Sequence, residues 1–297
     1  MSRTDEFSLA AVSSRRNVFR LGGGACLAMS MMGPLALVRA AVPFSSSRLR
    51  VTTVAAKGVS KGDIILIPGL ASGPELWAAL SPRLSAYRLH LVHIAGFSKL
   101  AAGANASGPL IQPIVDELAR YIREQHLRRP FVIGHSMGGI LGLMLGLRND
   151  VSLARLMVVD MLPEGSAMLG GTSAGFGYLA DQLNGYFTGT KAGRQMLAEI
   201  VQQTPGGRDS DPRVISQSLA ELAKLDLTPR LPALSCPLTV IYARPSDRNA
   251  AATQTAAYTA AYRGAKGAVV KGIGPSGHVI MADQPASFAE AVLKFLA

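Results

Sequence analysis

The stretch PFVIGHSMGG, residues Pro130–Gly139, decides the fold of this chain. It begins with a short apolar run typical of a buried strand, and an apolar, helix-like stretch follows it. Between the two stands Ser136, with a glycine two positions before it and another two positions after it. A sharp strand-to-helix turn leaves no room for side chains at those positions, which is why glycine is needed there. The stretch therefore predicts a strand, a tight turn that presents Ser136, and a helix.

The same Gly-x-Ser-x-Gly pattern occurs a second time, around Ser173. No apolar strand run precedes Ser173, and the residues after it, Phe176-Gly177-Tyr178, do not resemble a close-packed helix start. Ser136 is therefore the preferred nucleophile of the two. The turn around Ser136 resembles the nucleophile elbow of the α/β-hydrolases, in which the serine attacks a carbonyl carbon.

Apolar runs and helical stripes alternate along most of the chain. This alternation predicts an α/β fold with a mostly parallel central sheet, flanking helices and ligands at the carboxyl ends of the strands. An edge strand is expected at 49–55, and a helix that contains Trp77 follows the next strand. Further strands are expected at 63–67, 88–94, directly before the Ser136 turn, and at 153–160, 237–243 and 267–271, with helices at 108–127, from 139 onward, at 253–262 and at 285–295.

Residues 161–234 break this alternation, because they contain aromatic and helix-like stretches but no strand run. We interpret this segment as a mostly helical cap inserted into the hydrolase core. The predicted core then comprises residues 41–160 and 235–297.

The first 40 residues have the features of an export signal. Arg15 and Arg16 precede the apolar run Leu21–Val38, and small residues at Val38 and Ala40 suit a signal peptidase. The paired arginines resemble a twin-arginine signal, although Phe19 stands one place away from its usual position. These features predict a periplasmic or secreted protein that contacts the twin-arginine export machinery transiently. The alternative is an uncleaved segment that anchors the protein in the inner membrane.

The charge and cysteine content narrow the possible functions. Five basic and two acidic residues of the +11 chain lie in residues 1–40, so the remainder keeps a net charge of +8. These charges are scattered, with no basic run longer than Arg128-Arg129, which argues against nucleic-acid binding.

Cleavage after Ala40 would leave Cys236 alone, without an internal disulfide, and we expect Cys236 to be a packing residue.

Three residues match the order of a hydrolase triad, which is serine, acid and histidine after successive strands. The serine needs an imidazole to remove its proton, and the imidazole needs a carboxylate to fix its tautomer. Ser136, Asp247 and His278 have this order, and the glycine-rich loop at Gly277-His278 resembles the hydrolase histidine loop. Asp160 also ends a predicted strand and is the alternative acid, whereas Asp247 is preferred.

The segment Pro68–Gly73 resembles the oxyanion loop of the same family. The resemblance implies that the backbone N–H groups of Leu70 and Met137 stabilise the negative charge of the tetrahedral intermediate. The alternative is an ordinary strand-to-helix turn.

The resemblance implies a cofactor-independent serine hydrolase, and in particular a carboxylesterase for a moderately apolar, small-molecule ester. A serine nucleophile excludes the branches of the fold that use an aspartate, namely haloalkane dehalogenases and epoxide hydrolases. Acyl transfer, C–C bond hydrolysis and perhydrolysis use the same triad, and a non-catalytic ligand receptor on the hydrolase fold is a further alternative. The five histidines are not spaced as metal ligands, so neither a metal nor a cofactor is expected. The oligomeric state stays open.

Overall fold

The computed structural model describes residues 44–165, 190, 192–193 and 207–297. The chain divides into two units, Met1–Ala40 and Ala41–Ala297, and all described residues belong to the second, which is described by itself. The predicted export signal, Ser173 and much of the predicted cap lie outside the described residues. In the part that is described, no helix is long and apolar enough to cross a membrane.

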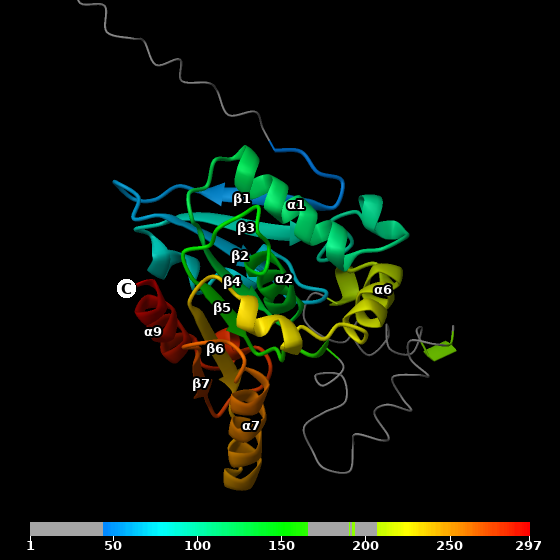
Figure 1. The fold of residues 1–297 in the computed structure, drawn as a ribbon. Helices are drawn as coiled ribbons and strands as arrows, with labels where there is room; N and C mark the ends of the chain where they lie inside the picture. Colours follow the sequence, from blue (N-terminus) through cyan, green and yellow to red (C-terminus); the bar gives the residue numbers. More distant parts are fainter. Residues whose placement is uncertain (1–43, 166–189, 191, 194–206) are drawn as a thin grey trace, which may run out of the picture. The chain divides into compact units, whose positions relative to one another are not determined.

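A seven-stranded sheet forms the centre of the second unit (Figure 1). Its strand order is β1-β3-β2-β4-β5-β6-β7, and only β1 runs antiparallel to its neighbour among these strands. The mostly parallel sheet with flanking helices that the sequence predicts is therefore confirmed. The strands are β1 Leu49–Val54, β2 Asp63–Ile67, β3 Arg88–Ile94, β4 Phe131–His135, β5 Leu156–Val159, β6 Leu238–Ala243 and β7 Val269–Ile273.

The continuous apolar runs form strands that are buried on both faces. In β2, Ile65 and Ile67 belong to the core on one side of the sheet, while Ile64 and Leu66 belong to the core on the other side. All four side chains are fully buried. Helices must therefore cover both faces, as is usual for parallel sheets.

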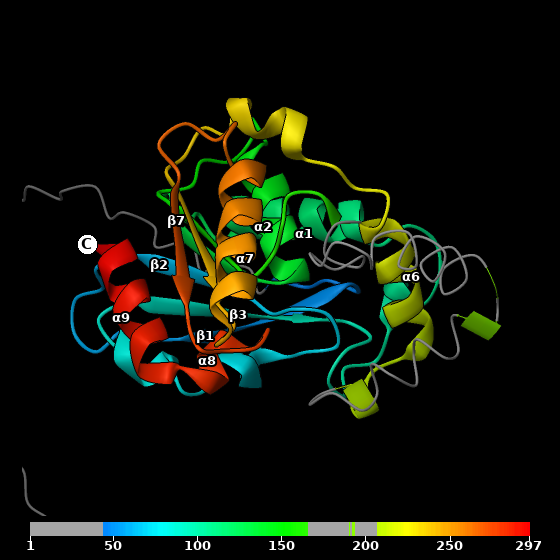
Figure 2. The ribbon, with the colours of Figure 1, turned by 90° about the horizontal axis from the view of Figure 1, so that it is seen from below.

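Each face of the sheet has its own layer of helices (Figure 2). The face of Ile65 and Ile67 packs against α1, α2, α6 and α7, whereas the opposite face packs against η1, η2, α8 and α9. The first set is α1 Ile111–Glu124, α2 Met137–Gly146, α6 Pro212–Leu222 and α7 Arg248–Ala261. The second set is η1 Pro74–Trp77, η2 Ser81–Leu84, α8 Ile280–Asp283 and α9 Pro285–Leu296. The described residues also form the short helices η3 Gly103–Ala106, η4 Gly207–Asp209 and η5 Thr228–Ala233.

The helix expected around Trp77 is instead a pair of short 3₁₀ helices, η1 and η2. Pro74 and Pro82 each lie at the start of one of them, where proline fits because no backbone N–H is needed. A continuous α-helix would place Pro82 in its interior, where its ring would collide with a carbonyl of the preceding turn. Trp77 nevertheless reaches the core and is fully buried.

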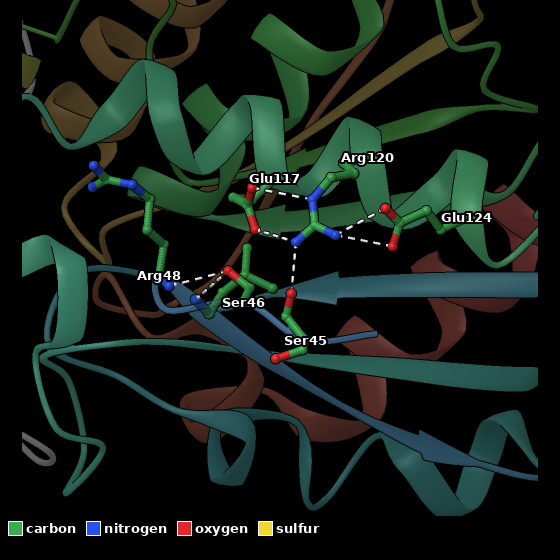
Figure 3. Close-up of polar contacts among 7 residues, drawn as sticks. Ser45, Ser46, Arg48, Glu117, Arg120 and Glu124 are labelled. Carbon is green, nitrogen blue, oxygen red and sulfur yellow. Dashed lines mark hydrogen bonds and ion pairs between the residues drawn. The ribbon is translucent and has the colours of Figure 1, made fainter. Parts of the chain in front are cut away.

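The described chain begins against the outer surface of α1 (Figure 3). The guanidinium of Arg120 binds Glu117 at 2.7 Å and Glu124 at 2.9 Å, and it donates to the carbonyl of Ser45 at 2.7 Å. It also lies 4.5 Å from the ring centre of Phe44. These contacts hold the segment before β1 on α1.

Candidate active site

Ser136 occupies a strained turn between β4 and α2. Its φ is 53° and its ψ is −123°, a backbone conformation that residues other than glycine rarely adopt. The Ser136 N–H donates to the carbonyl of Val159 on β5 at 2.9 Å, and its own carbonyl accepts from the N–H of Gly139 at 2.7 Å. The neighbouring strand and the first turn of α2 thus hold the serine in this conformation.

The two glycines of the elbow permit close backbone contacts that a side chain would prevent. A methyl group on Gly134 would collide with the carbonyl oxygen of Gly138. A methyl group on Gly138 would collide with the carbonyl oxygen of Ile67 at the end of β2. The elbow pattern therefore reflects the packing of α2 against β4 and β2, as the sequence predicts for a sharp strand-to-helix turn.

Asp160 follows β5 directly and is the carboxylate that contacts His278. Its Oδ2 lies 2.7 Å from Nδ1 of His278. Its Oδ1 accepts from the backbone N–H of Ala243 at 2.8 Å and from the hydroxyl of Tyr258 at 3.0 Å. Asp160 is only 4% exposed, and these bonds satisfy both oxygens of a carboxylate that has little access to water.

Asp247 does not contact His278, so the expected pairing of these two residues is wrong. Asp247 is the N-cap of α7, where its Oδ1 accepts from the backbone N–H of Ala250 at 2.7 Å. A carboxylate at this position satisfies a free N–H of the first helical turn. The structure therefore pairs His278 with the alternative acid, Asp160.

The histidine loop lies directly beside the elbow. The carbonyl of His278 is 2.9 Å from Nε2 of His135, the residue before Ser136, and the two imidazole rings are 4.7 Å apart. A carbonyl can only accept, so Nε2 of His135 carries the proton, which leaves its Nδ1 unprotonated and without a partner in the described part of the chain. Burial and the adjacent His278 lower the pKa of His135 to about 4. His135 is therefore a neutral donor.

The His278 loop has further supports within the described residues. The N–H of Gly277 donates to Asp283 at 2.7 Å, and the N–H of Ser276 donates to the carbonyl of Arg244 at 3.0 Å. The side chain of His278 is 44% exposed, which leaves its outer nitrogen accessible. Within the described part of the chain, the hydroxyl of Ser136 makes no direct hydrogen bond to this imidazole.

The expected oxyanion loop packs against the elbow. A methyl group on Gly69 would lie 3.0 Å from the Cβ of Ser136 and 2.8 Å from Nδ1 of His135, so the loop approaches both residues closely. Leu70 follows Gly69 in this loop, and Met137 is the first residue of α2, where an N–H has no helical acceptor. The two expected donors thus belong to segments that meet at Ser136, while their role in catalysis stays a prediction.

Sequence reasoning missed two residues of this site, His135 and Tyr258. His135 lies inside the elbow pattern, but nothing in that pattern indicates which loop it contacts. Tyr258 lies in the helix expected at 253–262 without any motif around it. Cys236 is buried, and burial raises the pKa of its thiol to about 11, in agreement with the expected packing role. The described residues contain no group of three or more histidine, cysteine or acidic side chains that could hold a metal ion.

Known proteins share both sequence and fold with this chain. The putative carbamate hydrolase RutD of Yersinia enterocolitica is 30% identical over 104 residues, which are 34% of this chain and 36% of that protein. The pimeloyl-[acyl-carrier protein] methyl ester esterase of Vibrio vulnificus is 23% identical over 198 residues, which are 61% of this chain and 75% of that protein. The matched part thus spans little more than a third of the carbamate hydrolase.

The fold is also similar to that of solved structures. An esterase from Exiguobacterium antarcticum superimposes with a TM-score of 0.62 at 18% identity, over 84% of this chain and 95% of the other. A putative epoxide hydrolase from Pseudomonas aeruginosa superimposes with a TM-score of 0.64 at 17% identity, over 85% and 93%. At these identities the likeness concerns the fold. The model of the alpha/beta hydrolase family matches residues 64–291, well over half of the chain. The chain therefore belongs to the alpha/beta hydrolase family.

Proposed function

We propose that this protein is a serine hydrolase that cleaves a moderately apolar carboxylic ester through an acyl-enzyme at Ser136. The observation that carries the proposal is the hydrogen bond between the buried Asp160 and His278, directly beside the strained turn of Ser136. A carboxylate that accepts from Nδ1 of a histidine leaves the other nitrogen as a base for a serine hydroxyl. Asp160 takes the role of the triad acid in this proposal.

The reaction follows from these positions. The Ser136 side chain first rotates toward Nε2 of His278, since catalytic hydrogen bonds often tighten only when substrate binds. His278 then accepts the hydroxyl proton while Oγ attacks the ester carbonyl, and the N–H groups of Leu70 and Met137 stabilise the resulting oxyanion. The ester C–O bond breaks, and His278 returns the proton to the leaving alcohol. A water molecule, deprotonated by His278, releases the acid and restores Ser136.

The names of sequence relatives also support an ester substrate. Proteins named as methyl ester esterases share sequence with the chain.

A panel of p-nitrophenyl esters with acyl chains of two to twelve carbons tests the proposal. We expect turnover by the wild type and a loss of kcat/KM of about 10³-fold or more in Ser136→Ala. A fluorophosphonate probe should label the wild type at Ser136 and leave the variant unlabelled. Equal turnover in both proteins would contradict the proposal, and binding without turnover or labelling would favour a ligand receptor instead.

We also propose export through the twin-arginine pathway, on the basis of Arg15, Arg16 and the apolar run that follows them. The test compares the wild type with a variant that carries Arg15→Lys and Arg16→Lys in a Gram-negative host. We expect the wild type in the periplasmic fraction and the variant in the cytosol. Equal export of both proteins would contradict this route, and a membrane-bound wild type would favour the uncleaved anchor.

A further inference from the structure

A buried tyrosine from α7 contacts the carboxylate that pairs with His278. Tyr258 is 1% exposed, and its hydroxyl lies 3.0 Å from Oδ1 of Asp160. The same oxygen accepts from the backbone N–H of Ala243 on β6 at 2.8 Å. Two donors from two separate elements therefore bind one oxygen of the carboxylate, while His278 binds the other.

This arrangement restricts the rotation of the carboxylate. An aspartate that is held by one oxygen alone can turn about its last side-chain bond, which is a broad torsion. Donors on Oδ1 from β6 and α7 fix the plane of the group, so that Oδ2 faces Nδ1 of His278. Such support by buried neighbours is how a reacting group is kept in its productive geometry.

Tyr258 is itself held in place. Its ring stacks on Tyr242 with a centroid distance of 4.6 Å and an interplanar angle of 16°. The hydroxyl of Tyr242 in turn donates to Thr255 on α7 at 2.8 Å. Burial, together with the negative charge of Asp160, raises the pKa of Tyr258, so its hydroxyl stays protonated and continues to donate throughout the working range of an esterase.

From these contacts we infer that Tyr258 is a positioning residue, which orients Asp160 for its bond to His278. This inference rests on the proposed function, because it concerns the same triad. In this role Tyr258 acts through Asp160 and takes no direct part in the bond changes at Ser136. The titratable groups that face Asp160 among the described residues are Tyr258 and Tyr262 at the end of α7, His278, and His135 on β4.

Tyr262 provides a matched control. It is also 1% exposed and follows α7 one turn after Tyr258, but its hydroxyl donates to the backbone carbonyl of Met161 at 2.7 Å. Tyr258→Phe and Tyr262→Phe each remove one buried hydroxyl from the same region, together with the hydrogen bond described above for it. Only the first removes a donor to Asp160.

The experiment measures kcat, KM and the pH profile of kcat/KM for the wild type and both variants, on an ester that the wild type turns over. Without the tyrosine donor, more negative charge stays on the oxygen that faces His278, which favours the protonated imidazole. We expect the acidic limb of the Tyr258→Phe profile to move to higher pH by about 0.3 to 1 unit. We expect kcat to fall about 3- to 30-fold with KM within about two-fold, and Tyr262→Phe to match the wild type.

A second readout does not need turnover. The proton shared by Asp160 and His278 gives a downfield ¹H resonance, identified by its loss in Asp160→Asn, and it should shift in Tyr258→Phe but not in Tyr262→Phe. Equal profiles and an unmoved resonance in Tyr258→Phe would overturn the inference. A shifted resonance in a protein without Ser136-dependent turnover would refute the proposed function and still support the positioning role of Tyr258.

Discussion

Nδ1 of His278 lies 2.7 Å from Oδ2 of Asp160, although 118 residues separate the two in the chain. The carboxylate thus comes from the end of β5, whereas Asp247 on the turn after β6 caps α7. The two aspartates therefore have different tasks, one in orienting the imidazole and the other in helix stability.

Separate substitutions distinguish these tasks. Asp160→Asn should lower kcat for ester hydrolysis by about 10⁴-fold, because an amide in place of the carboxylate favours the wrong histidine tautomer. Asp247→Ala should leave kcat within about two-fold of the wild type and lower the free energy of unfolding by about 1 kcal/mol, through loss of the N-cap. Steady-state kinetics and urea denaturation measure both effects. A large loss of kcat in Asp247→Ala alone would restore Asp247 as the acid.

The buried His135 should make stability depend on pH. Its pKa of about 4 in the folded protein lies below the ordinary value of 6.5, so the unfolded chain binds a proton between these values and the folded chain does not. The free energy of unfolding should therefore fall by about 3 kcal/mol from this group as pH drops from 7 to 4.

His135→Gln provides the comparison, because glutamine does not titrate and its amide can still donate to the carbonyl of His278. Urea denaturation at pH 7, 5.5 and 4 should show a smaller loss in the variant than in the wild type. Identical losses in the two proteins would mean that His135 is not held neutral by the fold.

The elbow glycines should tolerate no side chain. Gly134→Ala should lower the free energy of unfolding by more than about 3 kcal/mol, since its methyl group would collide with the backbone of Gly138. Gly264→Ala is the control, because its nearest neighbour would be 3.4 Å away, at the Cβ of Leu231. Thermal and urea denaturation of both variants test the difference, and a fully stable Gly134→Ala would contradict the close packing at the elbow.

Glu221 on α6 should stabilise the start of α1. Its carboxylate accepts from the N–H of Leu110 at 2.9 Å and of Ile111 at 2.8 Å, in place of a local cap. Glu221→Ala should cost about 1 to 2 kcal/mol of unfolding free energy. Glu124→Ala removes an exposed pair with Arg120 from the other end of α1 and should cost less than about 0.5 kcal/mol. Equal costs would show that the contact from α6 adds nothing beyond a surface pair.

The central strands were predictable because they are buried on both faces. Runs such as Ile64–Ile67 must be apolar at every position when helices cover each side, and such runs stand out in the sequence. The elbow was predictable because backbone crowding at Gly134 and Gly138 leaves a local pattern. The division of the segment around Trp77 into two 3₁₀ helices was harder to predict. It depends on Pro74 and Pro82, each of which lies at the start of one of these helices.

The partner of His278 could not be read from the sequence. Asp160 and Asp247 both follow strands, and strand order alone does not say which side chain turns toward the histidine loop. That direction depends on the positive φ of Asp160, 50°, and on donors from β6 and α7, which are distant in the chain. Asp247 is also drawn into a local bond with Ala250, which competes with any distant partner.

With Asp160, directly after β5, as the acid, the short turn from Pro245 to Asp247 has no part in the proposed chemistry. Arg244, the residue before this turn, still supports the histidine loop, because its carbonyl accepts from the N–H of Ser276. An insertion must therefore come after Arg244. The turn is therefore a natural insertion point for protein engineering. A peptide tag or a substrate-gating loop placed between Pro245 and Ser246 would begin one residue after Arg244, which contacts the histidine loop, and would leave Ser136, Asp160 and His278 on their own elements.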